Sequence, residues 1–105
     1  MILYSVTVSI DTNIADEWLQ WMTETHVPEV MNTGCFIESK ICRLLNGEED
    51  GGLTYSFQYL APSQADFDKY QKEHAPALQK DHSDKYAGKF AAFRTLLEVL
   101  DRTTI

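Results

Sequence analysis

Two histidines in similar surroundings are the residues best suited to chemistry in this chain. His26 and His74 each precede a proline by two residues, in the segments Glu24–Pro28 and Lys72–Pro76. Each lies on the apolar stripe of an expected helix, so both imidazoles should face the interior. Imidazole titrates near neutral pH, which suits proton transfer or ligand anchoring. Alternatively, each ring satisfies buried carbonyl groups that the proline leaves without a donor.

The spacing of the remaining histidine and the cysteines argues against a metal site. His82 lies eight residues after His74, about 12 Å along a helix, which is too far to share one ion. We expect His82 to be more exposed than His74. Cys35 and Cys42 fall on one expected strand, about 23 Å apart at 3.3 Å per residue, beyond the reach of a disulfide. The sequence also has no phosphate loop or dinucleotide fingerprint, so no cofactor is expected.

Arg94 and the aromatic side chains provide the other candidate chemistry. Arg94 lies among apolar residues, and a buried guanidinium needs a carboxylate, a carbonyl or an anionic ligand. A salt bridge to Glu38 or Glu98 would be the structural explanation. Most aromatic side chains should pack in the core, but around a cavity they would favour a flat apolar ligand. The candidate ligand-binding set is therefore His26, His74, Arg94, Trp18, Tyr55 and Tyr59.

Hydrophobic periodicity predicts the elements that must position these residues. Strands are predicted at 1–10, 35–45, 53–61 and 89–100, and helices at 13–31 and 64–86. The spacing in 89–100 also suits a helix, but a closing strand completes the architecture. Pro28 and Pro76 should interrupt the two helices, and Gly34 and Gly88 should end them. The acidic segment 46–52 should form an exposed hairpin tip.

Length and charge exclude several classes of protein. A chain of 105 residues forms one domain, 1–105. Its net charge of −7 disfavours binding to nucleic acid or to anionic lipid. The alternating N-terminal segment lacks the features of a signal peptide, and no apolar run has transmembrane length. We therefore expect a cytoplasmic protein with no membrane or nucleic-acid partner.

The two halves of the chain resemble each other. Each half has an expected strand, a helix containing His-x-Pro, and a glycine followed by a strand, as in Gly34–Phe36 and Gly88–Phe90. Two split βαβ units give an α+β fold, the ferredoxin-like βαββαβ sandwich. It has a four-stranded antiparallel sheet with two helices on one face.

The whole chain resembles an uncharacterised bacterial family, a domain of unknown function, of dimeric ferredoxin-like proteins. The resemblance rests on the segments Trp18–Met22, His26–Val30, Gly34–Phe36, Gly52 with Thr54–Tyr55, Gln58–Leu60, Glu73–Leu78, and Gly88–Phe90 with Phe93–Arg94. It implies a fold of the dimeric α/β-barrel type, shared by cofactor-independent quinol monooxygenases, muconolactone isomerases and chlorite-dismutase-type haem proteins. Such fold-level similarity assigns no activity.

The sequence is compatible with two functions. The protein could bind a small aromatic or apolar anionic molecule between sheet and helices. Alternatively, it could be a non-catalytic structural or protein-interaction module whose interior is filled by Trp18, Trp21 and Phe67. A homodimer is expected in either case, because the second sheet face carries a mixed polar and apolar surface that no helix of the chain can cover.

Overall fold

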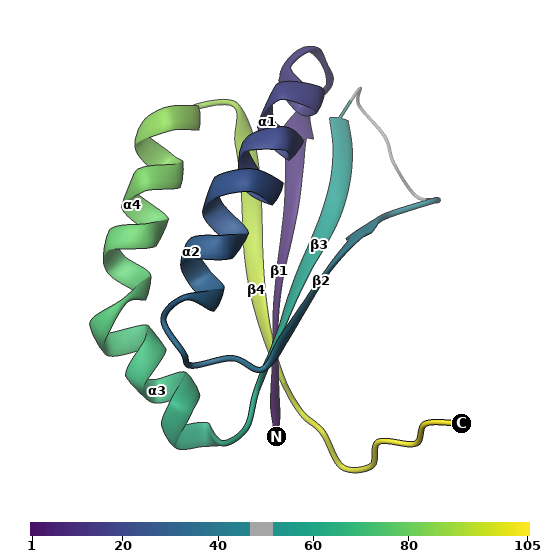
Figure 1. Ribbon diagram of the computed structural model, residues 1–105. Coiled ribbons are helices and arrows are strands. Elements are labelled where there is room, and N and C mark those ends of the chain that lie inside the picture. The colour runs from purple at the N-terminus through teal and green to yellow at the C-terminus, as the bar shows by residue number, and fades with distance from the viewer. Residues whose placement is uncertain (47–51) are drawn as a thin grey trace.

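The chain folds into one antiparallel sheet with its helices packed on one face (Figure 1). The computed structural model describes residues 1–46 and 52–105. In these residues the strands are β1 (Ile2–Asp11), β2 (Glu38–Arg43), β3 (Gly52–Ala61) and β4 (Phe90–Glu98), in the order β2-β3-β1-β4. The predicted ferredoxin-like sandwich is confirmed. Residues 47–51 of the predicted hairpin tip lie outside the described residues.

The central strand β1 sets which side chains face the helices. Tyr4 and Val8 are buried on this face, as the period-two pattern predicts. In the pairing with β3, Tyr4 lies opposite Tyr59. In the pairing with β4, Val6 lies opposite Arg94. The register therefore brings Arg94 to the helix-covered side, next to the aromatic side chains of β1 and β3.

The first helical segment is continuous but irregular. It consists of a 3₁₀ turn (Thr12–Ile14), α1 (Ala15–Trp21), a π-helical turn (Met22–His26) and α2 (Val27–Met31). Pro28 lies in the first turn of α2, where its missing N–H is tolerated. The interruption predicted at Pro28 is thus accommodated by a wider turn immediately upstream, and His26 is the last residue of that turn.

The second helical segment breaks at His74. It consists of α3 (Gln64–Glu73) and α4 (Ala75–Tyr86), and Pro76 lies in the first turn of α4. Ser63 caps α3: its hydroxyl accepts a hydrogen bond from the Asp66 amide at 3.2 Å and donates to the Asp66 carboxylate at 2.7 Å. His26 and His74 each occupy the position before the helix that carries the following proline, but His26 has helical backbone angles whereas His74 has a φ of −124° and interrupts the helix.

The predicted second strand is too long at its start. Gly34 has a φ of +77°, which glycine adopts without steric cost, and it turns the chain after α2. Cys35 and Phe36 are then buried in the core as part of the connection, and strand pairing begins at Glu38. Residues 90–98 form a strand, which resolves the ambiguity in that segment.

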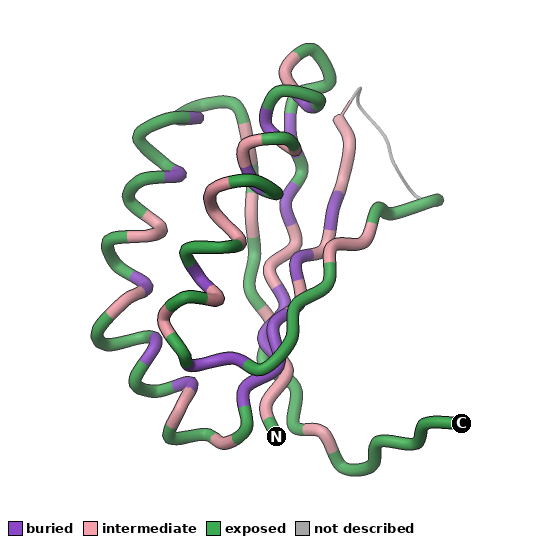
Figure 2. The backbone as a smooth tube through the Cα atoms, viewed as in Figure 1, coloured by how far each residue is buried: buried purple, intermediate pink, exposed green. Residues whose placement is uncertain are grey.

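The core lies between the sheet and the helices. Figure 2 shows the buried positions along the faces that α1, α3 and α4 turn toward the sheet. No described helix covers the opposite sheet face, where Phe93 is 63% exposed. In the part of the chain that the structure describes, no helix is long and apolar enough to cross a membrane.

Candidate functional site

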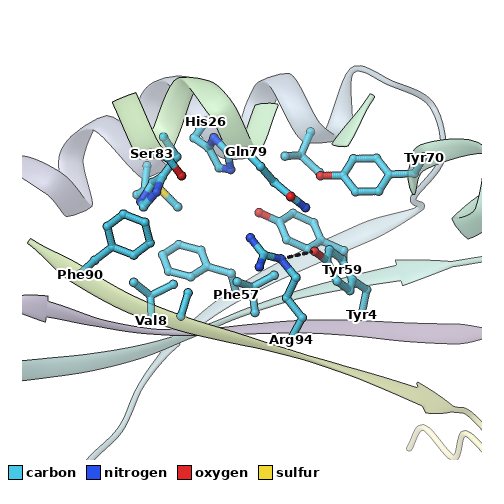
Figure 3. A pocket seen from close by; sticks show the side chains of 15 residues that line it. Tyr4, Val8, His26, Phe57, Tyr59, Tyr70, Gln79, Ser83, Phe90 and Arg94 are labelled. Atoms are coloured by element: carbon cyan, nitrogen blue, oxygen red, sulfur yellow. Dashed lines mark hydrogen bonds between the residues drawn. The ribbon is translucent and has the colours of Figure 1, made fainter. Parts of the chain in front are cut away.

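A cavity of about 50 Å³ lies between the sheet and the helices. Its walls are apolar and aromatic, and several polar groups face it from both layers (Figure 3). Its polar lining residues are Tyr4, His26, Tyr59, Tyr70, Gln79, His82, Ser83 and Arg94. Ser83 and Arg94 are exposed, so the cavity reaches the surface between α4 and β4. The interior is therefore not completely filled by aromatic side chains.

Arg94 is the cation of this site. Its side chain extends from β4 toward the helix layer (Figure 3), and its Nε donates a hydrogen bond to the Tyr4 hydroxyl at 3.1 Å. None of the described carboxylates forms a salt bridge with Arg94, and Glu38 instead contacts Arg102 at 3.3 Å. The alternative of a salt bridge to Glu38 or Glu98 is thus wrong. The other N–H groups of the guanidinium remain available to an acceptor.

Three tyrosines, Tyr4, Tyr59 and Tyr70, line the cavity together with Arg94. The ring centroids of Tyr4 and Tyr59 are 6.1 Å apart, and those of Tyr4 and Tyr70 are 6.0 Å apart. Burial raises the pKa of all three hydroxyls, and Arg94 opposes this rise in the pKa of Tyr4. The hydroxyls therefore stay protonated at neutral pH and act as hydrogen-bond donors and acceptors.

His26 faces the cavity from the π-helical turn. Its ring is partly buried and lies 5.9 Å from the ring of His82, centroid to centroid. Burial lowers the pKa of His26, while Asp81 raises it to a smaller extent. At neutral pH the imidazole is therefore uncharged and able to accept a proton or to bind a polar group. The structure thus places this predicted site residue at the cavity.

His82 is the residue that sequence reasoning misplaces. It is 8% exposed and lines the cavity, so the prediction that it is more exposed than the half-buried His74 is wrong. The side of α4 that faces the cavity runs through Gln79, His82 and Ser83. The sequence pattern that could have predicted the inward direction of His82 is its helical spacing from Tyr70 and Leu78.

The other predicted site residues divide into two groups. His74 lies away from the cavity, in a surface groove beside Asn32 and Leu78. Trp18 and Tyr55 are buried behind the cavity wall and pack on each other, with ring centroids 5.5 Å apart. Of the predicted set, the cavity therefore brings together His26, Tyr59 and Arg94. Within 1–46 and 52–105, no cluster of histidine, cysteine, aspartate or glutamate is arranged to hold a metal ion.

Tyr4, Gln79 and Ser83 are site residues that sequence analysis does not single out. Tyr4 alternates with apolar residues in β1, a pattern that predicts a core position. The feature that could have identified Tyr4 is its hydroxyl group, on the same sheet face as Arg94. Gln79 and Ser83 depend on the phase of α4 and cannot be placed as long as 64–86 is treated as one helix.

The strand order and the helices on one face of the sheet define a ferredoxin-like α+β fold. Several solved structures share it. A dimeric ferredoxin-like protein from an uncultured marine organism has 14% identity and a TM-score of 0.74, with 100% of both chains covered. A point mutant of MhuD with two manganese protoporphyrin IX bound per active site has 16% identity and a TM-score of 0.72, with 99% of both chains covered. A putative antibiotic biosynthesis monooxygenase from Bacillus cereus has 7% identity and a TM-score of 0.69, over 99% of this chain and 97% of that one.

The family model of the domain of unknown function DUF4286 matches residues 1–100, so the chain belongs to this family. The expected family of unknown function is thereby confirmed. No curated protein matches the chain significantly. Because the identities to the solved structures are low, these structures establish the fold alone.

Proposed function

We propose that this protein binds a small organic molecule with an aromatic or apolar body and a carboxylate or carbonyl group. The observation that carries the proposal is the cavity, where Arg94 has no carboxylate partner among the described residues and lies beside aromatic walls. Apolar walls with a few convergent polar groups are typical of ligand pockets. The guanidinium would bind the acceptor group, and Phe57, Phe90 and Tyr59 would contact the ring.

The size of the cavity indicates that binding moves a side chain. A cavity of about 150 Å³ accommodates benzene, whereas this one measures about 50 Å³. Arg94 is exposed at the opening and held by one hydrogen bond, to Tyr4. We therefore propose that the Arg94 side chain shifts as the aromatic body of the ligand enters, and that its guanidinium then binds the polar group of the ligand.

A porphyrin like those bound by the MhuD mutant does not suit the site as it stands. A macrocycle of four pyrrole rings needs far more space than the movement of one side chain would add to a cavity of about 50 Å³. In addition, Nε2 of His82 already accepts a hydrogen bond from Trp18 at 2.9 Å, so this nitrogen is not available to a metal. We therefore propose a ligand of one or two rings and no haem cofactor.

A thermal-shift screen tests the proposed ligand class. Benzoate, 2-naphthoate and the quinone menadione serve as probes, and an aromatic amine serves as the control of opposite charge. A ligand at ten times its Kd stabilises the folded state by about 1.4 kcal/mol, which raises the Tm of a domain of this size by about 6 to 10 °C. If none of the three acceptor-bearing probes raises the Tm, the alternative of a structural or interaction module is favoured.

We propose that the protein forms a homodimer through the uncovered face of its sheet. Support comes from the solved relative described as dimeric and from the composition of this face. Phe93 and Leu97 lie on it exposed, beside the polar pair Ser9 and Thr54, whose hydroxyls are 2.8 Å apart. A second copy related by a two-fold axis would bury this surface.

Replacing Phe93 by lysine is expected to weaken the dimer by at least tenfold, because a charge would be buried in an apolar interface. Sedimentation of wild type should give twice the monomer mass of 12.0 kDa, and the variant should shift toward the monomer. Leu45→Lys is the matched control, since Leu45 is 85% exposed beyond the end of β2. A monomeric wild type at micromolar concentration contradicts the proposal.

We also propose a cytoplasmic location. Cys35 and Cys42 are both free thiols, which suits a reducing compartment.

A further inference from the structure

A buried hydrogen bond between two helices involves a residue that does not line the cavity. The indole Nε1 of Trp18, in α1, donates a hydrogen bond to Nε2 of His82, in α4, at 2.9 Å. Trp18 is 0% exposed, and an indole N–H can donate but not accept. Nε2 of His82 must therefore be unprotonated, and a neutral His82 carries its proton on Nδ1.

The surroundings of His82 keep the ring uncharged. It packs edge-on against Phe90, with centroids 4.4 Å apart, and lies 6.1 Å from Trp21. Burial, followed by the neighbouring His26 and Arg94, lowers the pKa of His82 to about 4. At neutral pH each ring nitrogen therefore has one role. Nε2 accepts the hydrogen bond from Trp18, and Nδ1–H is a donor.

The geometry points to Trp18 as a positioning residue of the cavity. His82 lines the cavity and Trp18 does not, so the group that this imidazole offers to a ligand is Nδ1–H. We infer that Trp18 holds His82 as a neutral hydrogen-bond donor that binds the same carboxylate or carbonyl group as Arg94. This inference rests on the proposed ligand class, and it adds His82 to Arg94 as a second hydrogen-bond donor for the ligand. Such a pair of donors selects ligands with acceptor groups and disfavours amines.

The protonation state of His82 can be measured without any ligand. Long-range ¹H–¹⁵N NMR spectra of the wild-type protein at pH 7 should show His82 protonated on Nδ1 alone. In Trp18→Phe, which keeps an aromatic ring but removes the N–H, the spectrum should change to a mixture of the two tautomers. A His82 protonated on Nε2 in wild type overturns the inference, as does a Trp18→Phe spectrum identical to that of wild type.

Two conservative variants separate the ligand-binding role of His82 from its structural role. His82→Gln can place an acceptor where Nε2 lies, which retains the Trp18 contact, whereas His82→Asn can place an N–H where Nδ1 lies. With 2-naphthoate as probe, His82→Gln should keep the unfolding midpoint but bind about tenfold more weakly, and His82→Asn should bind more tightly than His82→Gln. Trp18→Phe should also weaken binding by severalfold.

The outcomes distinguish this inference from the proposed function. Absence of 2-naphthoate binding by wild type overturns the proposed function, and the donor role of His82 is then overturned with it. If wild type binds 2-naphthoate and His82→Gln binds it equally well, the inference fails while the proposed function stands. Weaker binding by His82→Gln, together with an Nδ1-protonated His82 in wild type, supports both.

Discussion

Replacing Arg94 by glutamine is expected to weaken the binding of 2-naphthoate by tenfold or more. Binding of the uncharged analogue 2-naphthamide should change much less. A hydrogen bond to a charged partner contributes about 1.5 to 3 kcal/mol, and each 1.4 kcal/mol corresponds to a factor of about ten in Kd. Arg94 is exposed at the cavity opening, so the lower end of this range applies. Titration calorimetry with both compounds measures the difference directly.

The choice of glutamine isolates the charge from the contact with Tyr4. A glutamine amide can still donate to the Tyr4 hydroxyl, which now accepts from Arg94 Nε at 3.1 Å. Arg94→Lys keeps the charge and should retain more of the affinity than Arg94→Gln. Arg102→Gln is the control, because it removes an arginine whose salt bridge with Glu38 lies outside the cavity. Equal losses of affinity for naphthoate and naphthamide would show that Arg94 acts through shape rather than charge.

The fold is predictable from the sequence because local patterns and the βαββαβ order agree. The alternation in 2–10 and 53–61 specifies which sheet face is apolar, and the register then follows from burial. That register also determines the direction of Arg94, because this residue lies opposite Val6 on the helix-covered face. The sequence alone leaves open whether Arg94 faces the helices or the dimer interface, because a single bulge in 89–100 would reverse its direction. The regular register of β4 places it on the helix-covered face.

The helical side of the site cannot be derived in the same way. Both prolines are recognisable as interruptions, but the sequence does not specify how each helix accommodates its proline. Upstream of Pro28 the chain adopts a π-helical turn that keeps His26 on the inward stripe, whereas before Pro76 it breaks at His74. The same His-x-Pro motif thus places one imidazole in the cavity and the other in a surface groove.

The contact between Trp18 and His82 shows what pairwise packing adds to sequence reasoning. The sequence predicts Trp18 as an aromatic wall of the ligand-binding site and His82 as a more exposed residue outside it. The contact between their nitrogens connects positions 64 residues apart in sequence, and no periodicity within one helix encodes such a contact. Once the two helices lie side by side on the sheet, the buried indole N–H requires an acceptor, and His82 provides it.

The free energy of unfolding is expected to decrease by about 1 to 2 kcal/mol between pH 7 and pH 5 because of His82. The pKa of His82 is lowered to about 4 in the folded protein, first by burial, whereas an unfolded histidine titrates near pH 6.5. Below pH 6.5 the unfolded chain therefore binds a proton that the folded protein excludes, so lower pH favours unfolding. From pH 6.5 to 5 the upper limit of this decrease is about 2.0 kcal/mol, at 1.36 kcal/mol per pH unit. Solvent screening at a ring that is only partly shielded from water lowers it toward about 1 kcal/mol.

Urea unfolding of wild type and His82→Gln at pH 7 and pH 5 isolates this contribution, because glutamine does not titrate and can still accept from Trp18 Nε1. The variant should lose most of the pH-dependent decrease of about 1 to 2 kcal/mol. His26 acts in the same direction, since burial also lowers its pKa, so His26→Gln should reduce the pH dependence further when combined with His82→Gln. His74→Gln is the matched control, because it removes a histidine outside the cavity. If His82→Gln and wild type lose the same stability on acidification, then His82 is not the neutral, buried donor on which the selectivity of the cavity depends.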